Sequence, residues 1–129
     1  MYAITTNHAR HIVHIRISGF WTEDMLVPFS SELRRAVDSL RVASGSHVVL
    51  VDVSEVAIQS QSVVAAFQKL IVQGPTHAKR LALYTTQMLP RMQARRISGV
   101  RDNVAVFGSE IEAEEWLLAP ERDTVTSDN

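Results

Sequence analysis

The chain has 129 residues, of which 46% are hydrophobic and 21% are charged, and it contains no cysteine. A chain of this length forms one domain and buries roughly two-thirds of the surface that its unfolded form exposes, which is enough for a self-sufficient core. The lack of cysteine excludes a disulfide framework, a thiol nucleophile and thiolate metal sites. No segment approaches the roughly 20 apolar residues of a membrane span, and the N-terminus lacks a signal-peptide pattern. We therefore expect a soluble, cytoplasmic protein.

The formal net charge of −1 conceals an uneven distribution of charge along the chain. Residues 74–103 carry six cations and one anion, a net charge of +5, whereas residues 104–129 carry one cation and seven anions, a net charge of −6. Charge runs are usually solvated helix faces, so we expect these two segments mainly to attract each other. The sharper alternative is a basic face that binds an anion.

The first part of the chain predicts a β-hairpin followed by a helix. Residues 2–6 and 11–18 are typical of strands, and in the second strand apolar and polar residues alternate. Thr22 is a candidate helix N-cap, and apolar residues then recur at spacings of three or four as far as Leu40. Pro28 interrupts this pattern, so the helix either kinks there or begins later.

A nearly uninterrupted apolar run at residues 47–53 predicts a central strand that is buried on both faces. Asp52 and Ser54 predict a polar loop at the carboxyl end of this strand, where open α/β sheets usually bind their ligands. Residues 61–73 predict the next helix, which the Gly-Pro pair at 74–75 ends.

The remainder of the chain continues to alternate between strand and helix. Residues 81–85 and 103–107 are predicted strands, and residues 87–97 are a predicted helix. Ser109 begins a capping box for a last helix. The polar tail at residues 119–129 is predicted to be disordered.

The predicted element order is ββαβαβαβα, within a single domain that spans residues 1–118. Alternation of strands and helices favours parallel pairing through right-handed crossovers and leaves the first strand as an antiparallel edge. The expected fold class is therefore α/β, with a mixed, mostly parallel five-stranded sheet and helices packed on it.

The order of these elements resembles that of the SpoIIAA-like proteins of the STAS superfamily, the sulfate-transporter and anti-sigma-factor-antagonist domains. The resemblance spans roughly residues 2–118. It is carried by the two-strand start, the helix after residues 19–24, the strand that ends at residues 52–54, and residues 104–107 leading into residues 112–117. It implies a small binding or regulatory domain. Related lipid-exchange domains of the CRAL-TRIO type use the same architecture.

The regulatory members of this superfamily resemble one another in an Asp-Ser-Ser-Gly motif at the start of the helix after the central strand, and the first serine of that motif is phosphorylated. An ungapped alignment places residues 60–63 there, with Gln61 at the phosphorylated position. This departure predicts a domain without the usual phospho-switch. An alignment shifted by one residue would restore Ser60 or Ser62; otherwise one of these serines simply caps the helix.

Two sets of residues are candidates for a binding site. The first set lies at the end of the central strand and the start of the next helix, and would contact a protein partner or a second copy of the chain: Asp52, Ser54, Ser60, Gln61 and Ser62. The second set has large, apolar side chains and would line a pocket for a small apolar ligand: Met25, Phe29, Phe67, Met88 and Met92.

A third candidate site is the basic helix. Arg91 and Arg95 are four residues apart and share a helix face, with Arg96 beside them. This arrangement suits an anion or an acidic partner. Aromatic residues are not interleaved with these cations, which disfavours nucleic-acid binding.

Signals for metal binding and catalysis are weak. His8, His11 and His14 are three apart, and on a strand this spacing alternates between faces, which disfavours a shared metal. Asp52 with His77 is a candidate acid–base pair, although carboxylates at strand ends more often bind backbone amides. The sequence lacks a phosphate loop, a nucleophile elbow and a nucleotide-binding fingerprint. We expect a non-enzymatic module without a cofactor that acts through protein contacts or self-association; the alternative is a carrier of a small apolar ligand or lipid between helices and sheet.

Overall fold

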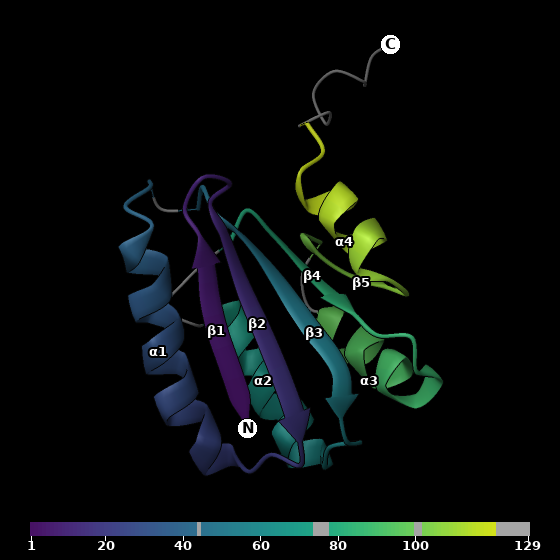
Figure 1. The fold of residues 1–129 in the computed structure, drawn as a ribbon. Coiled ribbons are helices and arrows are strands. Elements are labelled where there is room, and N and C mark those ends of the chain that lie inside the picture. Colours follow the sequence, from purple (N-terminus) through teal and green to yellow (C-terminus); the bar gives the residue numbers. More distant parts are fainter. Residues whose placement is uncertain (44, 74–77, 100–101, 121–129) are drawn as a thin grey trace.

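The computed structural model describes residues 1–43, 45–73, 78–99 and 102–120, without the side chains of residues 73, 88–90, 97 and 98. These residues form strands and helices in the predicted order (Figure 1). The strands are β1 (Tyr2–Asn7), β2 (Ile12–Gly19), β3 (Val48–Val56), β4 (Arg80–Tyr84) and β5 (Val104–Phe107). The helices are a 3-10 turn, η1 (Glu23–Met25), and α1 (Leu26–Ser39), α2 (Gln61–Gln73), α3 (Met88–Ser98) and α4 (Glu110–Leu117).

The five strands form one sheet in the order β1-β2-β3-β4-β5. β1 pairs antiparallel with β2, and every other neighbouring pair is parallel. Each of α1, α2 and α3 joins two adjacent parallel strands, and their buried residues share one core on one face of the sheet. α4 follows the last strand and packs on the opposite face, over β3, β4 and β5. The predicted fold class, including the antiparallel first strand at the edge, is confirmed.

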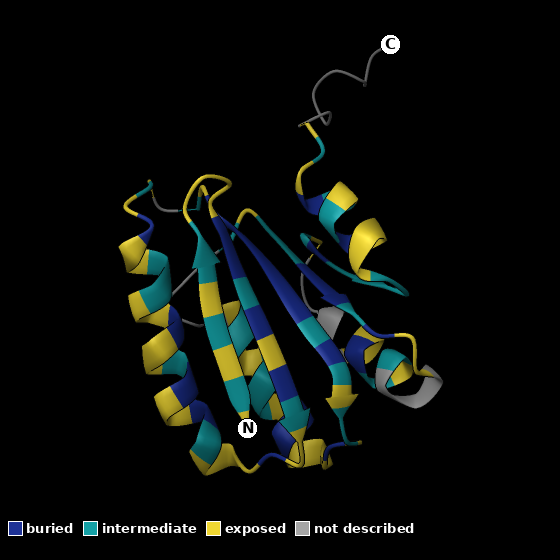
Figure 2. Ribbon diagram, in the orientation of Figure 1, coloured by how far each residue is buried: buried dark blue, intermediate teal, exposed yellow. Residues whose placement is uncertain are grey.

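The sheet separates two hydrophobic cores, and β3 contributes to both (Figure 2). Val49 and Val51 of β3 face the larger core, which they share with Phe29 of α1. Leu50, between them, faces the smaller core beneath α4, where it packs with Leu117. This division follows from the strand geometry, because consecutive side chains point to opposite faces of a sheet.

Helix α1 begins later than its N-cap candidate. Thr22 precedes the 3-10 turn η1, and α1 begins only at Leu26. Pro28 therefore occupies the first turn of α1, where a backbone N–H has no partner within the helix and proline is tolerated. Of the two alternatives that Pro28 leaves open, the later start is the one found.

Strand β3 continues to Val56, beyond the predicted end of the strand. Pairing with β2 extends it, up to the partners Gly19 and Val56, across an irregularity in register between Arg16 and Ser18. Asp52 therefore lies inside the strand, on the same side of the sheet as α4, and the prediction of a loop at Asp52 is wrong.

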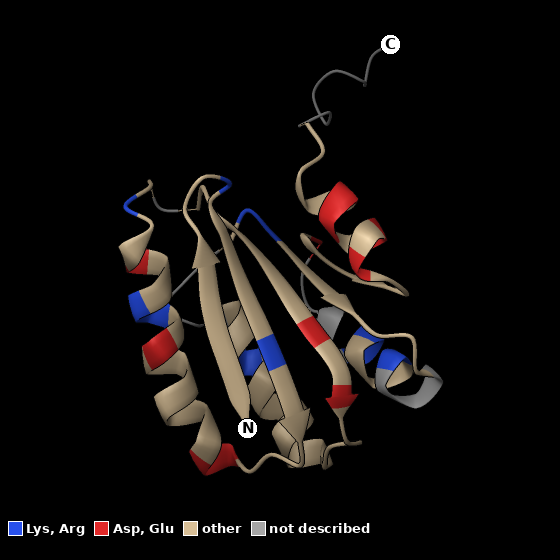
Figure 3. Cartoon of the chain, in the orientation of Figure 1, with Lys and Arg blue, Asp and Glu red and all other residues tan. Residues whose placement is uncertain are grey.

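The oppositely charged C-terminal segments gather on different helices. Figure 3 shows basic residues on α3 and acidic residues on α4, and these helices lie on opposite faces of the sheet. Arg80, at the start of β4, lies over the ring of Trp116 at 5.4 Å and donates to the backbone oxygens of Trp116 and Ala119. The described residues end at Pro120, so most of the predicted disordered tail lies outside them.

Candidate functional site

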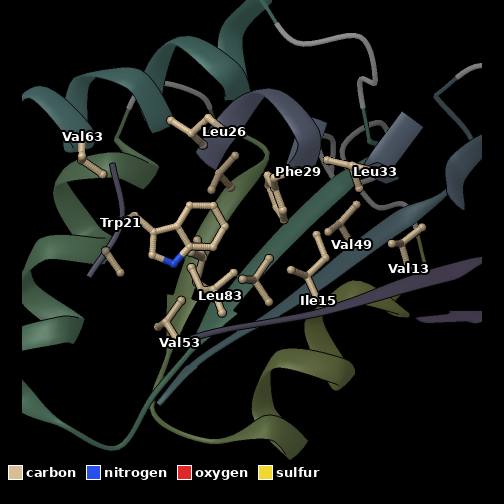
Figure 4. Packing of buried hydrophobic residues seen from close by; sticks show 14 of the residues in the cluster. Val13, Ile15, Trp21, Leu26, Phe29, Leu33, Val49, Val53, Val63 and Leu83 are labelled. Atoms are coloured by element: carbon tan, nitrogen blue, oxygen red, sulfur yellow. The ribbon is translucent and has the colours of Figure 1, made fainter. Parts of the chain in front are cut away.

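A cavity of about 120 Å³ lies within the larger core, between the sheet and helices α1, α2 and α3. Each helix contributes to its wall, with Phe29 from α1, Phe67 from α2 and Ala94 from α3. The strands contribute aliphatic side chains such as Ile15 and Val49, which Figure 4 shows packed in this core with Phe29. Protein interiors have few voids larger than a water molecule, and an apolar cavity of roughly 150 Å³ binds benzene. The cavity therefore has the volume of a small hydrocarbon group.

Two glutamines form the polar part of the cavity wall beside the start of α2. Gln59 is 8% exposed; its Oε1 accepts from the N–H of Trp21 at 2.8 Å, and its Nε2 donates to the carbonyl oxygens of Gly19, at 2.9 Å, and Ala57. The side chain of Gln93 in α3 binds the backbone of Gln59 twice, accepting its N–H at 2.8 Å and donating to its carbonyl oxygen at 2.9 Å. We call this pair of side chains the glutamine clamp.

The glutamine clamp ties together three parts of the chain at the wall of the cavity. It joins the β2–η1 connection, the β3–α2 connection and α3, so both amide groups are occupied by backbone partners. Asn103, the other polar residue in the wall, donates to the carbonyl oxygen of Ala78 at 2.9 Å. The polar side chains of the wall are thus engaged within the protein, and the cavity presents mainly apolar surface.

The glutamine clamp was not predicted from the sequence. Gln59 lies in a connection, where a polar residue is expected to face solvent. A signal for Gln93 was nevertheless present, because it lies four residues after Leu89 and four before Ile97, on the apolar stripe of its helix. A glutamine at a core position of an amphipathic helix indicates a buried hydrogen-bonding role.

The cavity coincides only in part with the predicted apolar pocket. Phe29 and Phe67 line it as predicted. Met25 packs against the core outside the cavity, and Met92 is 56% exposed, so the prediction that these two line the pocket is wrong. Among the described side chains of α3, those that line the cavity are Gln93 and Ala94, the residues that follow Met92. The side chain of Met88 lies outside the described residues.

The predicted partner-binding residues occupy two separate places. Ser60 caps α2, since its Oγ accepts from the N–H of Val63 at 3.3 Å and lies 3.1 Å from the Oγ of Ser62. Gln61 and Ser62 are exposed beside Ser60, in the first turn of α2, whose other side packs in the larger core. Asp52 faces the opposite side of the sheet. The structure therefore keeps Asp52 with Ser54 and does not bring it together with Ser60 and Ser62.

Asp52 is the centre of a hydrogen-bonded network on its side of the sheet. Its carboxylate lies 3.4 Å from the Nε of Arg16 and accepts from the backbone N–H of Ser54 at 2.9 Å, and Tyr84 lines a groove together with it. Burial acts to raise the pKa of Asp52, but the hydrogen bonds from Ser54 and Tyr84 and the charge of Arg16 outweigh it and hold the pKa below its usual value. Burial and the neighbouring carboxylates raise the pKa of Tyr84, so its hydroxyl keeps its proton. Asp52 is therefore an ionised acceptor with its partners in place.

The three arginines of α3 differ in their surroundings. Arg91 is half-buried and donates from Nε and Nη2 to the carbonyl oxygen of Thr85, at 3.4 and 3.2 Å. Its guanidinium also lies against Gly108, where an added Cβ would be 2.8 Å from Nη2. Arg95 and Arg96 are exposed in the last turn of α3. Arg91 thus fastens α3 to the ends of β4 and β5, which leaves the surface cations of this helix to Arg95 and Arg96.

The described residues contain no group of three side chains placed to hold a metal ion. His8 and His11 lie exposed in the β1–β2 turn, and His14 lies on β2. His77, the candidate partner of Asp52 in acid–base chemistry, lies outside the described residues. A helix long and apolar enough to cross a membrane is likewise absent from the part of the chain that is described.

Comparison with known proteins relates this fold to a solved structure. No family model and no curated protein matches the sequence. A solved structure of an uncharacterised DUF3478-family protein with a SpoIIAA-like fold, from Shewanella loihica PV-4, superimposes with a TM-score of 0.67. It is 18% identical, and the match covers 91% of this chain and 92% of that chain. The chain has a SpoIIAA-like fold. The resemblance found in the sequence is thereby confirmed for the fold, and a SpoIIAA-like fold does not by itself assign an activity.

Proposed function

We propose that this protein is a non-enzymatic binding module and that its ligand is a small apolar molecule, or the hydrocarbon part of a larger one, held in the cavity beneath α1, α2 and α3. The observation that supports this proposal is the cavity itself, about 120 Å³ of space walled by aliphatic and aromatic side chains. At about 24 cal/mol per Å³, an empty cavity of that volume costs about 3 kcal/mol of stability. A larger residue at Ala94 would remove much of this cost, so the open space favours a binding role.

The lining restricts the chemistry of the ligand. Among the residues that the structure describes, those that line the cavity include no Asp, Glu, Lys, Arg or His, and their amide groups are already bound to the backbone. A charged or hydrogen-bonding group placed inside would lose its hydration without compensation, which costs several kcal/mol. The volume is close to that of the cavity that binds benzene, so a complete two-chain lipid does not fit within it.

The proposal is tested by filling the cavity. Ala94→Leu projects three more carbon atoms from the wall of the cavity, whereas Ala65→Leu makes the same change on the exposed side of α2 and serves as the matched control. Benzene is the probe, and the readout is the rise in melting temperature that a ligand produces when it binds only the folded state. We expect benzene to raise the melting temperature of the wild type and of A65L but not of A94L. An equal rise in A94L, or no rise in the wild type, would overturn the proposal.

A second candidate function, self-association through protein contacts, is favoured by exposed apolar side chains next to the glutamine clamp. Phe20 is 75% exposed and lies between two residues whose backbones bind Gln59. Ile58, directly before Gln59, is also exposed. Gln59 therefore brings the Phe20 and Ile58 segments side by side, and adjacent apolar residues of this kind mark contact surfaces more often than isolated ones do.

Self-association is tested by light scattering over a concentration series. The variant replaces Phe20 and Ile58 by serine, and Val72→Ser, on an exposed position of α2, is the control. We expect the wild type and V72S to form dimers at high concentration and the double variant to stay monomeric. A monomeric wild type would remove this candidate and would leave the benzene experiment unaffected.

A further inference from the structure

The side of the sheet that faces away from the cavity holds a second concave site. A groove of about 300 Å³ lies over β1, β2, β3 and β4 beside the N-terminus of α4. Figures 1 and 2 show that α4 leaves the β1 and β2 part of this face open, with exposed residues along both strands. We call this site the sheet-face groove, and its lining residues are Ala3, Thr5, His14, Ile15, Arg16, Leu50, Asp52, Tyr84 and Glu110.

One side of the sheet-face groove carries a cation with unused hydrogen-bonding capacity. The side chain of Arg16 is 69% exposed, and its Nε lies against Asp52. Its two terminal nitrogens, Nη1 and Nη2, donate no hydrogen bond to any of the described residues. Thr5 is paired across the strands with His14, and both lie beside Arg16 on this face, so further donors adjoin the guanidinium. A guanidinium with two free amino groups suits a carboxylate, which it can bind through two parallel hydrogen bonds.

The other side of the sheet-face groove carries an anion. Glu110 is the exposed first residue of α4, and its charge acts on the hydroxyl of Tyr84 from nearby. Within the described part of the chain Glu110 makes no ion pair, whereas the neighbouring Asp52 is already bound by Arg16, Ser54 and Tyr84. Glu110 is therefore the carboxylate of the groove that remains open to a cationic group.

We propose that the sheet-face groove binds a small zwitterion, such as an amino acid, with its carboxylate on Arg16 and its ammonium group on Glu110. A ligand with one charge would satisfy only one side, whereas a zwitterion satisfies both and brings no net charge into the groove. Leu50 and Ala3 supply an apolar floor for the carbon atoms between the two charges. Asp52 holds the Arg16 side chain, which reduces the conformational freedom that Arg16 loses on binding.

The sheet-face groove and the cavity lie on opposite faces of the sheet; Ile15 lines both, and among the described residues they share no charged residue. The volume of the groove lies at the lower end of the range of small-molecule sites, roughly 300 to 1,000 Å³. A titration of the groove with a charged ligand therefore tests the groove alone, whatever the outcome with benzene.

The experiment is a titration followed by amide chemical shifts, with probes of four carbon atoms. α-Aminobutyrate and γ-aminobutyrate carry both charges at different separations, butyrate carries only the carboxylate, and butylamine carries only the ammonium group. The variants are Arg16→Met and Glu110→Gln, which remove one charge from each side of the groove. Glu112→Gln on the exposed side of α4 and Arg35→Met on α1 remove the same charges elsewhere.

We expect at least one aminobutyrate to produce saturable shifts at the amides of Thr5, Asp52 and Glu110. Loss of one charge-assisted contact corresponds to about tenfold weaker binding, so R16M and E110Q should each weaken the affinity by about that factor while E112Q and R35M leave it unchanged. Absence of saturable shifts with both aminobutyrates would overturn the proposal. Equal affinity for butyrate or butylamine, or wild-type affinity in E110Q, would overturn it as well.

Discussion

Replacement of Gln59 by methionine tests how much the glutamine clamp contributes to the stability of the folded protein. Methionine has nearly the length and volume of glutamine, so the change removes hydrogen bonds while it leaves little empty space. The bonds that are lost are those to the N–H of Trp21 and to the carbonyl oxygens of Gly19 and Ala57. The bonds that Gln93 makes to the backbone of residue 59 remain available in the variant.

The expected loss of stability follows from the burial of these groups. The bond to Trp21 is buried, and an unpaired buried donor costs about 1–3 kcal/mol. The two carbonyl bonds are part-buried and contribute about 0.5–1.5 kcal/mol each. Burial of the apolar methionine side chain offsets part of the free energy that is lost with these hydrogen bonds. We therefore expect Q59M to lower the free energy of unfolding by about 2–4 kcal/mol. For a domain of this size that is a fall of roughly 10 °C in melting temperature.

Urea unfolding followed by far-ultraviolet circular dichroism measures this change through the midpoint and the slope of the transition. The matched control is Gln61→Met, because Gln61 is exposed two residues away, and we expect it to stay within about 0.5 kcal/mol of the wild type. If Q59M also stayed within that limit, the bonds of Gln59 would be readily replaced by water. That result would refute the claim that the backbone groups around Gln59 depend on its side chain for their hydrogen bonds.

Three further predictions concern single residues outside the clamp. Because the pKa of Asp52 is lowered, its ionised form stabilises the folded state above the unfolded pKa of about 3.9, and this stabilisation is lost as the pH falls through the folded pKa. The difference in urea midpoint between the wild type and D52N should therefore narrow below about pH 4, and a constant difference would contradict this. Burial lowers the pKa of His47, whose Nε2 has no hydrogen-bond partner among the described residues, so below about pH 6.5 the unfolded state binds more protons and stability falls. Between pH 7.5 and 5.5 the urea midpoint of H47L, measured at about half-unit steps of pH, should fall less than that of the wild type. An equal fall in both proteins would exclude His47 as the source of the pH dependence. Arg41 has a φ of 55°, which costs a non-glycine residue about 1–2 kcal/mol, so R41G should raise stability by about 0.5–1 kcal/mol in thermal unfolding rather than lower it.

The sequence predicted the fold because each element carries its own periodicity. The apolar run before Asp52 and the cap at Ser109 are local signals, and both correspond to observed elements. The end of β3 was misplaced because pairing with β2, as far as Gly19, extends the strand past two polar residues. Strand ends of this kind are determined by a partner strand that lies far away in the sequence.

The candidate sites were harder to predict than the fold, because they depend on contacts between distant segments. Phe67 was correctly placed in the cavity wall, since it lies on the apolar stripe of α2. Met92 was placed there as one of the apolar residues of its helix that can face the core, but α3 turns it toward solvent. The sheet-face groove combines Arg16, Asp52 and Glu110 from β2, β3 and α4, and local periodicity contains no information about that convergence.

Strand β3 connects the two sites, which makes their independence testable. Val51 and Val53 line the cavity, and Asp52 between them lines the sheet-face groove. The strand is hydrogen-bonded on both sides, to β2 and to β4, and the cavity already exists without a ligand. Filling the cavity therefore requires no movement of β3, and we expect saturating benzene to leave the affinity for an aminobutyrate unchanged within about twofold. A tenfold change would show instead that β3 shifts when the cavity fills, and linkage would then require the aminobutyrate to alter benzene binding by the same factor.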